Sequence, residues 1–402
     1  MKTNVYTDQI SACSEVLHRG GLLAVPTETV YGLAANGLDA AAVGEIYEVK
    51  GRPAVKPLSL MVPGPEAMDL YCLDVPDTAR ALAEQFWPGP LTIVLKAKDI
   101  IPPIVRAGGD TIGLRCPDHP LTLSVLRDSG LPLAAPSANP SGQPSPKTAQ
   151  EVLAYFDGRI DAILDGGPCG IGTESTIISL ADSPYRILRQ GALSAEEIAD
   201  ALVEHMTIFG ITGGSGSGKT TALQVLRELG ALVIDADAVY HELLTSDLAL
   251  LNAIEARFPG TVRNETLNRK ALAAAVFGDP AALADLNRLT HPAVIEESKR
   301  RLREHAMSGG TLAAIDAIGL IGSGLDKLCD RTYAVLADRE IRVRRIMARD
   351  GLTREHAEAR IAAQLPDVFF VSHCSGVLHN DSTEASFRSL CKKIFLEEIH
   401  HG

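Results

Sequence analysis

The chain has 402 residues, of which 46% are hydrophobic, and its formal net charge is −12. This length allows two domains of ordinary size, each with its own hydrophobic core. The acidic balance disfavours broad binding to nucleic acid, which depends on clustered lysine and arginine, so we expect no direct DNA binding. A local basic pocket for phosphate groups remains compatible with this composition.

The cysteines and the N-terminal stretch indicate the compartment. Seven cysteines are scattered along the chain, and no pair has the C-x-x-C spacing. This pattern is unlike a disulfide framework or a zinc site and is typical of a reducing compartment. The stretch MKTNVYTDQI has no apolar segment, and no run of about 18 apolar residues follows it. We therefore expect a cytoplasmic protein that has no membrane partner.

Hydroxyl side chains follow two expected strands in the first half of the chain. After a helix over residues 10–19, a buried strand over 22–25 runs into the segment PTETVYG. A second strand, over 131–135, runs into Pro-Ser-Ala-Asn at 136–139. Ligands of α/β folds bind at the ends of strands, so both segments are candidate contacts.

A basic segment follows the helix expected over residues 40–49. Lys50, Arg52 and Lys56 lie within seven residues, with a glycine and a proline between them and a second proline directly after Lys56. Such a segment cannot form one face of a regular helix. It is either a solvated charge run or a set of fixed anion contacts, and the prolines favour the second interpretation.

The remaining elements of the first half complete an α/β pattern. Strands are expected over 111–115 and 161–165, and the final helix, over 194–204, begins with a Ser-x-x-Glu capping box. The loop at 140–147 is either a mobile linker or a lid over the site. No nucleophile, His–Asp pair or metal cluster stands out. The pattern predicts an anion site that uses Lys50, Arg52, Lys56, Arg115 and Arg189.

This half resembles a known enzyme family. The ordered segments PTETVYGL, KGRPAVKPL, FWPGPLT, LRCP, APSANPSG, GTESTI and LRQG are similar to the YrdC-like L-threonylcarbamoyladenylate synthases over most of residues 10–200. The resemblance implies a twisted α/β domain that converts L-threonine, bicarbonate or CO₂ and ATP into threonylcarbamoyl-AMP and pyrophosphate. That product serves the threonylcarbamoyladenosine modification of tRNA, so tRNA-modification proteins are candidate partners.

The resemblance also implies roles for individual residues. ATP would be held by Arg52, Lys56, Thr111, Ser137, Asn139, Ser145 and Arg189, with Lys50 and Arg52 as the catalytic cations. Threonine would be held by Thr29, Arg115, the backbone at Ala135, and Ser175. A carbamate oxygen attacks the α-phosphorus, so the protein mainly positions two anions and neutralises the leaving pyrophosphate. Many relatives have histidine where this chain has Met61.

A phosphate-loop pattern opens the second half. An apolar run at 208–211 predicts a buried strand, the glycine-rich loop Gly213-x-x-x-x-Gly218-Lys219-Thr220 follows, and a helix comes next. Backbone N–H groups and the helix start attract phosphate. Lys219 would reach the β- and γ-phosphates, and the Thr220 hydroxyl would bind Mg²⁺. The predicted ATP contacts are Gly213, Gly216, Ser217, Gly218, Lys219, Thr220 and Thr221.

The position of this loop predicts the domain organisation. It starts about half-way along the chain, whereas phosphate loops usually follow the first strand of their domain. We therefore expect one domain over residues 1–205 and a second over 206–402, the latter a three-layer α/β/α domain.

Acidic strand ends and an arginine-rich stretch complete the second half. A strand from residue 231 is expected to end in Asp235 and Asp237, with a helix from Ala238; the carboxylates are either helix caps or proton acceptors in phosphoryl transfer. The strand 312–316 ends in Asp316, where a carboxylate would support Mg²⁺. The arginines of 342–360 form either a solvated helix face or a closing lid.

The second half resembles the dephospho-CoA kinases. The similarity lies in TGGSGSGKTT, VIDADAV, LTHP, SGLDKLCD, RIMARDGLTREHAEARIAAQ and the segment Leu-His-Asn at 378–380. It implies a P-loop kinase with helical acceptor and lid segments, which transfers the γ-phosphate of ATP to the ribose 3′-hydroxyl of dephospho-CoA. Asp237 would be the base, supported by Asp235, and Lys219 would be catalytic. Arg345 and Arg349 would close over the phosphates and exclude water.

The main hypothesis is thus a bifunctional enzyme that uses ATP at both sites and Mg²⁺ as cofactor. One alternative makes the first half an RNA-binding module without catalysis. Another makes the second half a nucleotide-sensing domain with impaired kinase activity. It is motivated by Ile-Gly-Leu-Ile-Gly at 318–322, where the family usually reads Pro-Leu-Leu-x-Glu.

Overall fold

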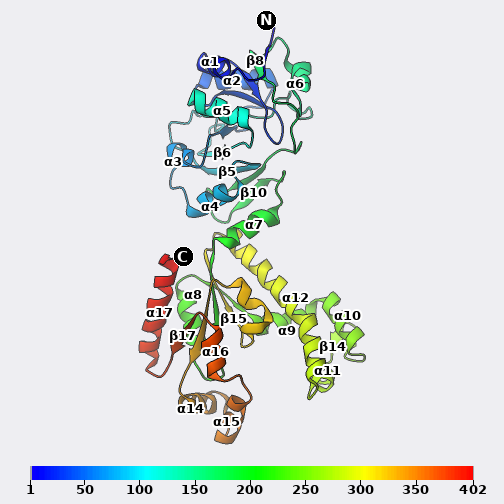
Figure 1. Ribbon diagram of the computed structural model, residues 1–402, viewed down its shortest axis with the longest axis vertical. Coiled ribbons are helices and arrows are strands. Elements are labelled where there is room, and N and C mark those ends of the chain that lie inside the picture. Colours follow the sequence, from blue (N-terminus) through cyan, green and yellow to red (C-terminus); the bar gives the residue numbers. More distant parts are fainter. Residues whose placement is uncertain (1, 402) are drawn as a thin grey trace. The chain divides into compact units, whose positions relative to one another are not determined.

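The computed structural model describes residues 2–401, which separate into two compact units (Figure 1). The first unit extends to His205 and includes Met307–Gly309. The second contains Met206–Ala306 and the residues from Gly310 onward. Every helix in the described part of the chain is too short or too polar to cross a lipid bilayer.

The first unit is built on one mixed sheet, which over residues 2–205 has ten strands in the order β1-β8-β2-β3-β7-β4-β6-β5-β9-β10. The strands are β1 Asn4–Tyr6, β2 Leu23–Val25, β3 Gly32–Asn36, β4 Ser59–Met61, β5 Leu91–Lys96, β6 Thr111–Arg115, β7 Leu133–Ala134, β8 Ala162–Leu164, β9 Thr176–Ser179 and β10 Arg186–Arg189. The helices are α1 Ile10–His18, α2 Ala40–Lys50, α3 Ala67–Tyr71, α4 Asp77–Phe86, α5 Pro120–Ser129, α6 Ala149–Phe156 and α7 Ala195–Glu204.

Local sequence signals explain where several of these helices begin and end. Asp39 caps α2 by accepting hydrogen bonds from the N–H groups of Ala41 and Ala42. Helix α7 has the predicted capping box, in which Ser194 and Glu197 satisfy each other's backbone N–H groups. Strand β6 spans Thr111–Arg115 as predicted. Helix α2 and strand β6 both lead to the site described below.

The second unit contains a five-stranded sheet, parallel throughout, with the order β12-β15-β11-β16-β17 within the described residues. Its strands are β11 Thr207–Thr212, β12 Leu232–Asp235, β15 Leu312–Asp316, β16 Arg331–Leu336 and β17 Gly376–His379; β13 Val262–Arg263 and β14 Thr266–Leu267 form a separate hairpin. The helices are α8 Lys219–Glu228, α9 Ala236–Ser246, α10 Leu248–Arg257, α11 Arg269–Val276, α12 Pro280–Met307, α13 Leu320–Ser323, α14 Arg339–Asp350, α15 Arg354–Ala362, α16 Asp367–His373 and α17 Glu384–His401, with a 3₁₀ turn η1 at Leu325–Leu328.

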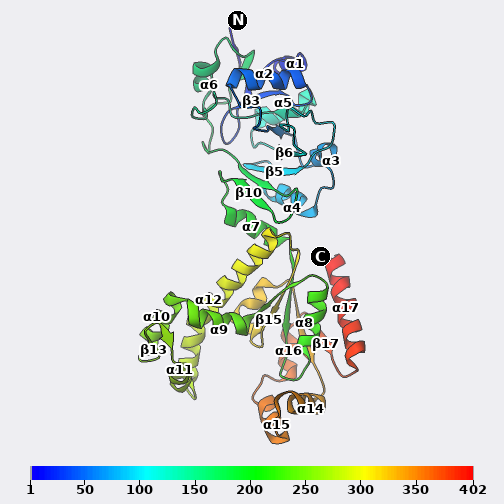
Figure 2. The same ribbon diagram turned by 180° about the vertical axis from the view of Figure 1, so that it is seen from behind.

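The helices of the second unit cover both faces of its sheet. Both views show α8 and α17 on one side of the strands and α9 and α12 on the other (Figures 1 and 2). The helices α10 and α11 accompany α12, and α14 and α15 form a helical hairpin at one end of the sheet. The predicted three-layer arrangement, with separate helical segments, is therefore present.

One boundary differs from the prediction. Strand β12 ends at Asp235, and α9 begins at Ala236 rather than at Ala238. The Asp235 side chain accepts a hydrogen bond of 3.0 Å from the N–H of Ala238, which caps the helix and ends the strand early. Asp237 consequently lies in the first turn of α9 and not at a strand end.

An aromatic cluster lies between the sheet and α17. The rings of Phe209 and Phe395 have centroids 5.1 Å apart, and Tyr333 contacts both rings at 6.0–6.2 Å. Phe209 and Phe395 are fully buried. Tilted contacts of this kind add to the hydrophobic stabilisation of the core. The cluster therefore attaches α17 to the centre of the second unit.

We expect Phe395→Ala to lower the free energy of unfolding of the second unit by about 3–5 kcal/mol, because it leaves a cavity in this cluster. The midpoint of its thermal transition should fall by about 6–20 °C, measured by circular dichroism. Phe277→Ala is the matched control, since that ring is 90% exposed. Trp87, the only tryptophan, reports on the first unit, and its fluorescence transition should keep its midpoint.

Candidate active sites

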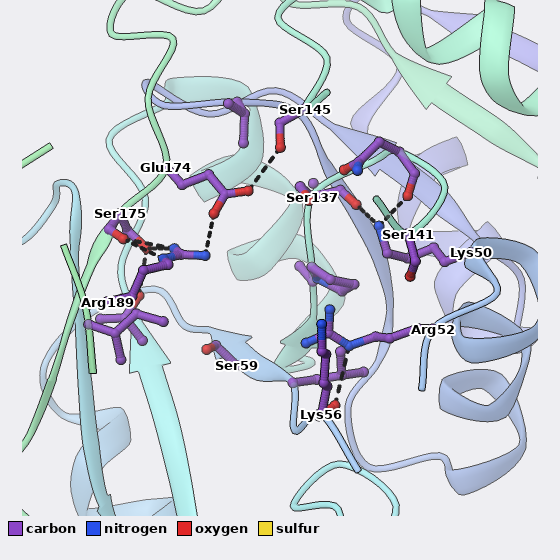
Figure 3. A pocket seen from close by; sticks show the side chains of 18 of the residues that line it. Lys50, Arg52, Lys56, Ser59, Ser137, Ser141, Ser145, Glu174, Ser175 and Arg189 are labelled. Carbon is purple, nitrogen blue, oxygen red and sulfur yellow. Dashed lines mark hydrogen bonds and ion pairs between the residues drawn. The ribbon is translucent and has the colours of Figure 1, made fainter. Parts of the chain in front are cut away.

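A cavity of about 350 Å³ lies in the first unit and brings together most of the residues predicted there. Figure 3 shows Lys50, Arg52 and Lys56 on one side of this pocket and Arg189, Ser175 and Glu174 on the other. Of the predicted contacts, it is lined by Lys50, Arg52, Lys56, Arg115, Ala135, Ser137, Asn139, Ser145, Ser175 and Arg189.

Lys50 is the last residue of α2 and is almost completely buried. Its ammonium group donates hydrogen bonds to the backbone carbonyls of Ser137 and Asn139. These carbonyls favour the charged form, whereas burial and the nearby charge of Arg52 lower the pKa of Lys50 to about 7. The amine is therefore held at the cavity wall and titrates close to neutral pH.

The segment after α2 fixes the guanidinium of Arg52. Its Nε donates to the carbonyl of Lys56 at 3.2 Å, and its Nη2 donates to the carbonyl of Pro57 at 2.8 Å. The Tyr47 hydroxyl donates to the same Lys56 carbonyl at 2.9 Å. Burial lowers the pKa of Arg52. Backbone contacts of this kind fit the fixed anion site better than a solvated charge run.

Arg189 and Ser175 form the facing wall of the cavity. Arg189 Nη2 donates to the Ser175 carbonyl at 2.7 Å and to its hydroxyl at 3.1 Å. Arg189 Nη1 forms an ion pair with Glu174, and the Ser145 hydroxyl donates to the other oxygen of Glu174 at 2.8 Å. Glu174 was not predicted from the sequence, because its partners lie 15 and 29 residues away along the chain.

Arg115 is a buried cation of the site with side-chain partners. It is 7% exposed, and its Nη2 donates to Glu28 Oε1 at 2.7 Å and to the Thr29 hydroxyl at 2.8 Å. Thr29 is completely buried and does not line the cavity, so in this arrangement it supports Arg115. Glu28 was also missed by the sequence interpretation, although it stands within the segment PTETVYG.

Thr111 is not brought together with the other predicted residues. It lies at the opposite end of β6 from Arg115 and does not line the cavity. Four residues along a strand span roughly 13 Å. The alternation of a strand puts the two side chains on one face. They are nevertheless too far apart along the strand for one ligand group to contact both.

Asn139 leaves an acceptor without a partner. Its Nδ2 donates to the carbonyls of Pro140 at 2.9 Å and Gln143 at 2.7 Å, which fixes the orientation of the amide. The buried Oδ1 has no hydrogen-bond partner among the described residues. Because Asn139 lines the cavity, a donor group of a ligand could satisfy this oxygen.

The phosphate loop of the second unit forms a cavity of about 660 Å³. Of the predicted residues, it is lined by Gly213, Gly216, Gly218, Lys219, Thr220, Arg345 and Arg349. Ser217 and Thr221 do not line it; Ser217 is buried and its carbonyl accepts a hydrogen bond of 2.8 Å from Asn380 Nδ2. The first turn of α8 begins at Lys219, beside the cavity, where helix N–H groups attract anions.

Two glycines of the loop cannot carry a side chain. Gly218 has φ +104°, and a β-carbon there would lie 2.0 Å from the Asn380 amide nitrogen. Gly213 has φ +135°, and a β-carbon there would lie 2.3 Å from the Val335 carbonyl oxygen. The loop conformation therefore requires glycine at both positions.

Lys219 and Asp316 form a close pair beside the loop. The ammonium lies 2.7 Å from Asp316 Oδ1, and burial raises the pKa of this carboxyl group. Within residues 2–401, no group of three or more His, Cys, Asp or Glu side chains is placed to hold a metal ion. The Thr220 hydroxyl at the cavity and the Asp316 carboxylate beside Lys219 are oxygen groups, the type of ligand that Mg²⁺ takes from a protein before phosphate and water complete its shell.

Arg345 connects the lid hairpin to the phosphate loop. Its Nη1 donates to the carbonyls of Gly216 at 3.3 Å and Ser217 at 3.2 Å, and its Nη2 donates to the carbonyl of Asn380 at 3.2 Å. Arg349, one turn further along α14, is paired with Asp350 at 2.7 Å and is largely exposed. Arg345 is thus already attached to the loop, whereas Arg349 faces the cavity from a solvated position.

A second lid contact was not predicted. Ser215 donates its N–H to Gln364 Oε1 at 3.0 Å and accepts a hydrogen bond from Gln364 Nε2 on its hydroxyl at 2.8 Å. Its carbonyl accepts from Arg342 Nε at 3.1 Å. Gln364 lies 149 residues from Ser215, so no local pattern could have indicated this pairing.

Asp237 lies at a separate cavity of about 280 Å³ between α9, α12 and the segment after β15. Tyr240, Asn287 and His291 also line it. Ala317 and Gly319 line this cavity while Ile318 lines the phosphate-loop cavity, so the segment 317–319 separates the two. Asp235 is not at this cavity; it caps α9.

Comparisons with known proteins divide the chain at the same place. The family described as Telomere recombination, which is the Sua5–YciO–YrdC family, matches residues 15–191. The family described as Dephospho-CoA kinase matches residues 207–386.

Individual relatives agree with these families. The threonylcarbamoyl-AMP synthase of Bacillus subtilis is 47% identical over 191 residues, which cover 47% of this chain and 55% of that protein. The dephospho-CoA kinase of Geobacter sulfurreducens is 37% identical over 196 residues, which cover 48% of this chain and 100% of that protein. A solved structure of Pyrococcus abyssi Sua5 complexed with L-threonine is 28% identical, with a TM-score of 0.49, and the match covers 81% of this chain and 95% of that one.

The chain spans about half the length of the first curated synthases that it matches, with shares between 49% and 60%. It covers the whole length of the Geobacter sulfurreducens kinase. Both families consist of enzymes that transfer groups from ATP. The chain belongs to the Sua5–YciO–YrdC family in its first unit and to the dephospho-CoA kinase family in its second.

Proposed function

We propose that the chain is a bifunctional transferase. Its first unit forms L-threonylcarbamoyladenylate from L-threonine, bicarbonate or CO₂ and ATP, and its second unit phosphorylates the 3′-hydroxyl of dephospho-CoA. The observation that carries this proposal is the presence of two separate cavities, each lined by groups that suit the phosphates of ATP. One is lined by the side chains of Lys50, Arg52, Lys56 and Arg189, and the other by loop backbone and Lys219.

In the first unit, the geometry suits a reaction in which the protein positions two anions. Arg115, held by Glu28, would pair with the carboxylate of threonine. Lys50, Arg52 and Arg189, which line the cavity, would neutralise the negative charge that develops on the departing pyrophosphate. Fixed cations of this kind stabilise the transition state without reorganisation, so no protein nucleophile is required.

In the second unit, the loop amides and Lys219 would hold the β- and γ-phosphates, and Arg345 and Arg349 would cover them. Bound Mg²⁺, held by Thr220 and Asp316, would neutralise phosphate charge. Asp237, at the adjoining cavity, would accept the proton of the attacking hydroxyl. The lid would keep water from the γ-phosphate.

Gly322 supports a second candidate for this unit, a nucleotide-binding domain with impaired kinase activity. The segment Leu320–Ser323 contains Gly322 at φ +88°, a conformation that residues with a side chain rarely adopt. The segment on the acceptor side therefore differs from the usual family pattern in residue type, and its backbone at Gly322 is one that a glutamate would rarely adopt. Normal ATP-dependent conversion of dephospho-CoA to CoA would remove this candidate.

Two single substitutions should separate the activities. We expect Arg52→Ala to lower threonine-dependent pyrophosphate release by about 10²- to 10³-fold, because it removes a fixed cation at the leaving group. Lys219→Ala should lower CoA formation by a similar or larger factor. Each variant should retain the activity of the other unit. Loss of both activities in either variant would contradict independent sites.

Asp237→Asn should lower the kcat of CoA formation by about 10²- to 10⁴-fold, because the amide cannot accept the hydroxyl proton. The KM for ATP should change little, since Asp237 does not line the phosphate-loop cavity. Glu265→Gln, an exposed carboxylate in the β13–β14 turn, is the control for removing one negative charge. An unchanged kcat in Asp237→Asn would rule out Asp237 as the base.

The synthase should lose its dependence on Lys50 as the pH rises. The ammonium is present below its pKa of about 7 and is lost above it. We therefore expect the ratio of kcat/KM for ATP between the native chain and Lys50→Met to be largest near pH 6. The ratio should shrink towards pH 8.5, and titrations of the substrates cancel in it. A ratio that stays constant over this range would mean that Lys50 does not titrate there.

A further inference from the structure

Glu174 is the only carboxylate among the described residues that line the cavity of the first unit. It lies in the segment just before β9, beside Ser175. The same cavity is lined by the cations Lys50, Arg52, Lys56, Arg115 and Arg189. A negative side chain in such surroundings needs an explanation, because the cavity is otherwise suited to anionic ligands.

Both oxygens of Glu174 are engaged with groups that we assign to ATP. One oxygen forms the ion pair with Arg189 Nη1, and the other accepts the 2.8 Å hydrogen bond from the Ser145 hydroxyl. Figure 3 shows Glu174 between these two side chains, connected to each. Arg115 has a different partner, Glu28, which does not line the cavity. Glu174 therefore occupies two of the expected phosphate contacts.

The carboxylate also offsets repulsion between the cations. The charge of Arg189 disfavours the protonated form of Arg52, and the charge of Arg115 disfavours that of Arg189. The charge of Glu174 favours the protonated form of Arg52 and of Arg189. A polyphosphate would provide the same counter-charge. It could not share Arg189 with Glu174 without bringing two negative groups together, which costs free energy. The Glu174 side chain is 35% exposed, so it has solvent into which it can turn.

We propose that Glu174 is an internal stand-in for phosphate. It holds Ser145 and Arg189 in place while the cavity lacks a polyphosphate, and the phosphates of ATP displace it. The same carboxylate competes with pyrophosphate for Arg189 and thereby assists product release. Glu174 is thus a positioning residue that sets the affinity for both polyphosphates. Naming ATP and pyrophosphate as the ligands rests on the proposed synthase function.

Direct binding tests the displacement without relying on catalysis. The full chain carrying Lys219→Ala, which disables the phosphate loop, is titrated calorimetrically with inorganic pyrophosphate. Adding Glu174→Gln should lower the Kd about two- to fivefold, because binding no longer has to break a partly exposed ion pair. Glu48→Gln, an exposed carboxylate on α2 that does not line the cavity, should leave the Kd unchanged.

Steady-state kinetics test the same displacement in a second way. In threonine-dependent pyrophosphate release, Glu174→Gln should lower the KM for ATP and strengthen inhibition by pyrophosphate by similar factors. The kcat should stay level or fall, because the product leaves more slowly. A merely structural role would raise KM, and a role as ligand of the Mg²⁺ that accompanies ATP would weaken binding of both polyphosphates.

Whether Glu174→Gln strengthens or weakens pyrophosphate binding decides the proposal. Equal or weaker pyrophosphate binding in Glu174→Gln, with a native thermal unfolding curve, overturns the proposal. Should that variant fail to fold, Glu174→Asp takes its place. Its shorter side chain cannot reach Ser145 and Arg189 together, and unchanged or weaker binding there is equally negative. Absence of threonine-dependent pyrophosphate release in the native chain would defeat the proposed function, while the titration would still decide whether Glu174 is displaced.

Discussion

Both candidate sites depend on grouping positively charged side chains in one cavity. Like charges gathered in a partly buried cavity repel one another, and burial removes the water that would screen them. In both units most of the cations are held by fixed acceptors. Arg115 pairs with Glu28, Arg189 with Glu174 and Lys219 with Asp316, while Lys50 is held by backbone carbonyls. Each cavity therefore gathers positive side chains, and the acceptor groups beside most of them reduce their mutual repulsion.

The two units build their cavities from different parts of the chain. The first gathers side chains from the end of α2, the loop after β7, the segment before β9 and the end of β10, so its site exists only when the mixed sheet has formed. The second cavity is lined largely by one segment, the loop between β11 and α8 together with the first residues of α8. The conformation of this loop requires glycine at positions such as Gly218, where a β-carbon would lie too close to Asn380.

This difference explains what could be predicted from the sequence. The loop of the second unit, the capping box at Ser194 and the strand Thr111–Arg115 depend on neighbouring residues, and all three were predicted. Glu174 and Gln364 were missed because their partners are brought near only by the fold. Periodicity placed Thr111 on the correct face of β6 but carried no information on how far it lies from the cavity. The early start of α9 followed from a single side-chain cap that competed with the strand.

The contacts of Ser215 connect the loop of the second unit to its lid. Its N–H, hydroxyl and carbonyl are all bound by Arg342, which lies in α14, and by Gln364, which follows the end of α15. Arg342 in turn donates to Gln364 Oε1 at 2.9 Å and pairs with Asp367 at 3.2 Å, so the contacts form one network. Any outward movement of the hairpin must break these bonds. Because a glycine-rich loop has little conformational preference of its own, its shape and the position of the lid depend on each other.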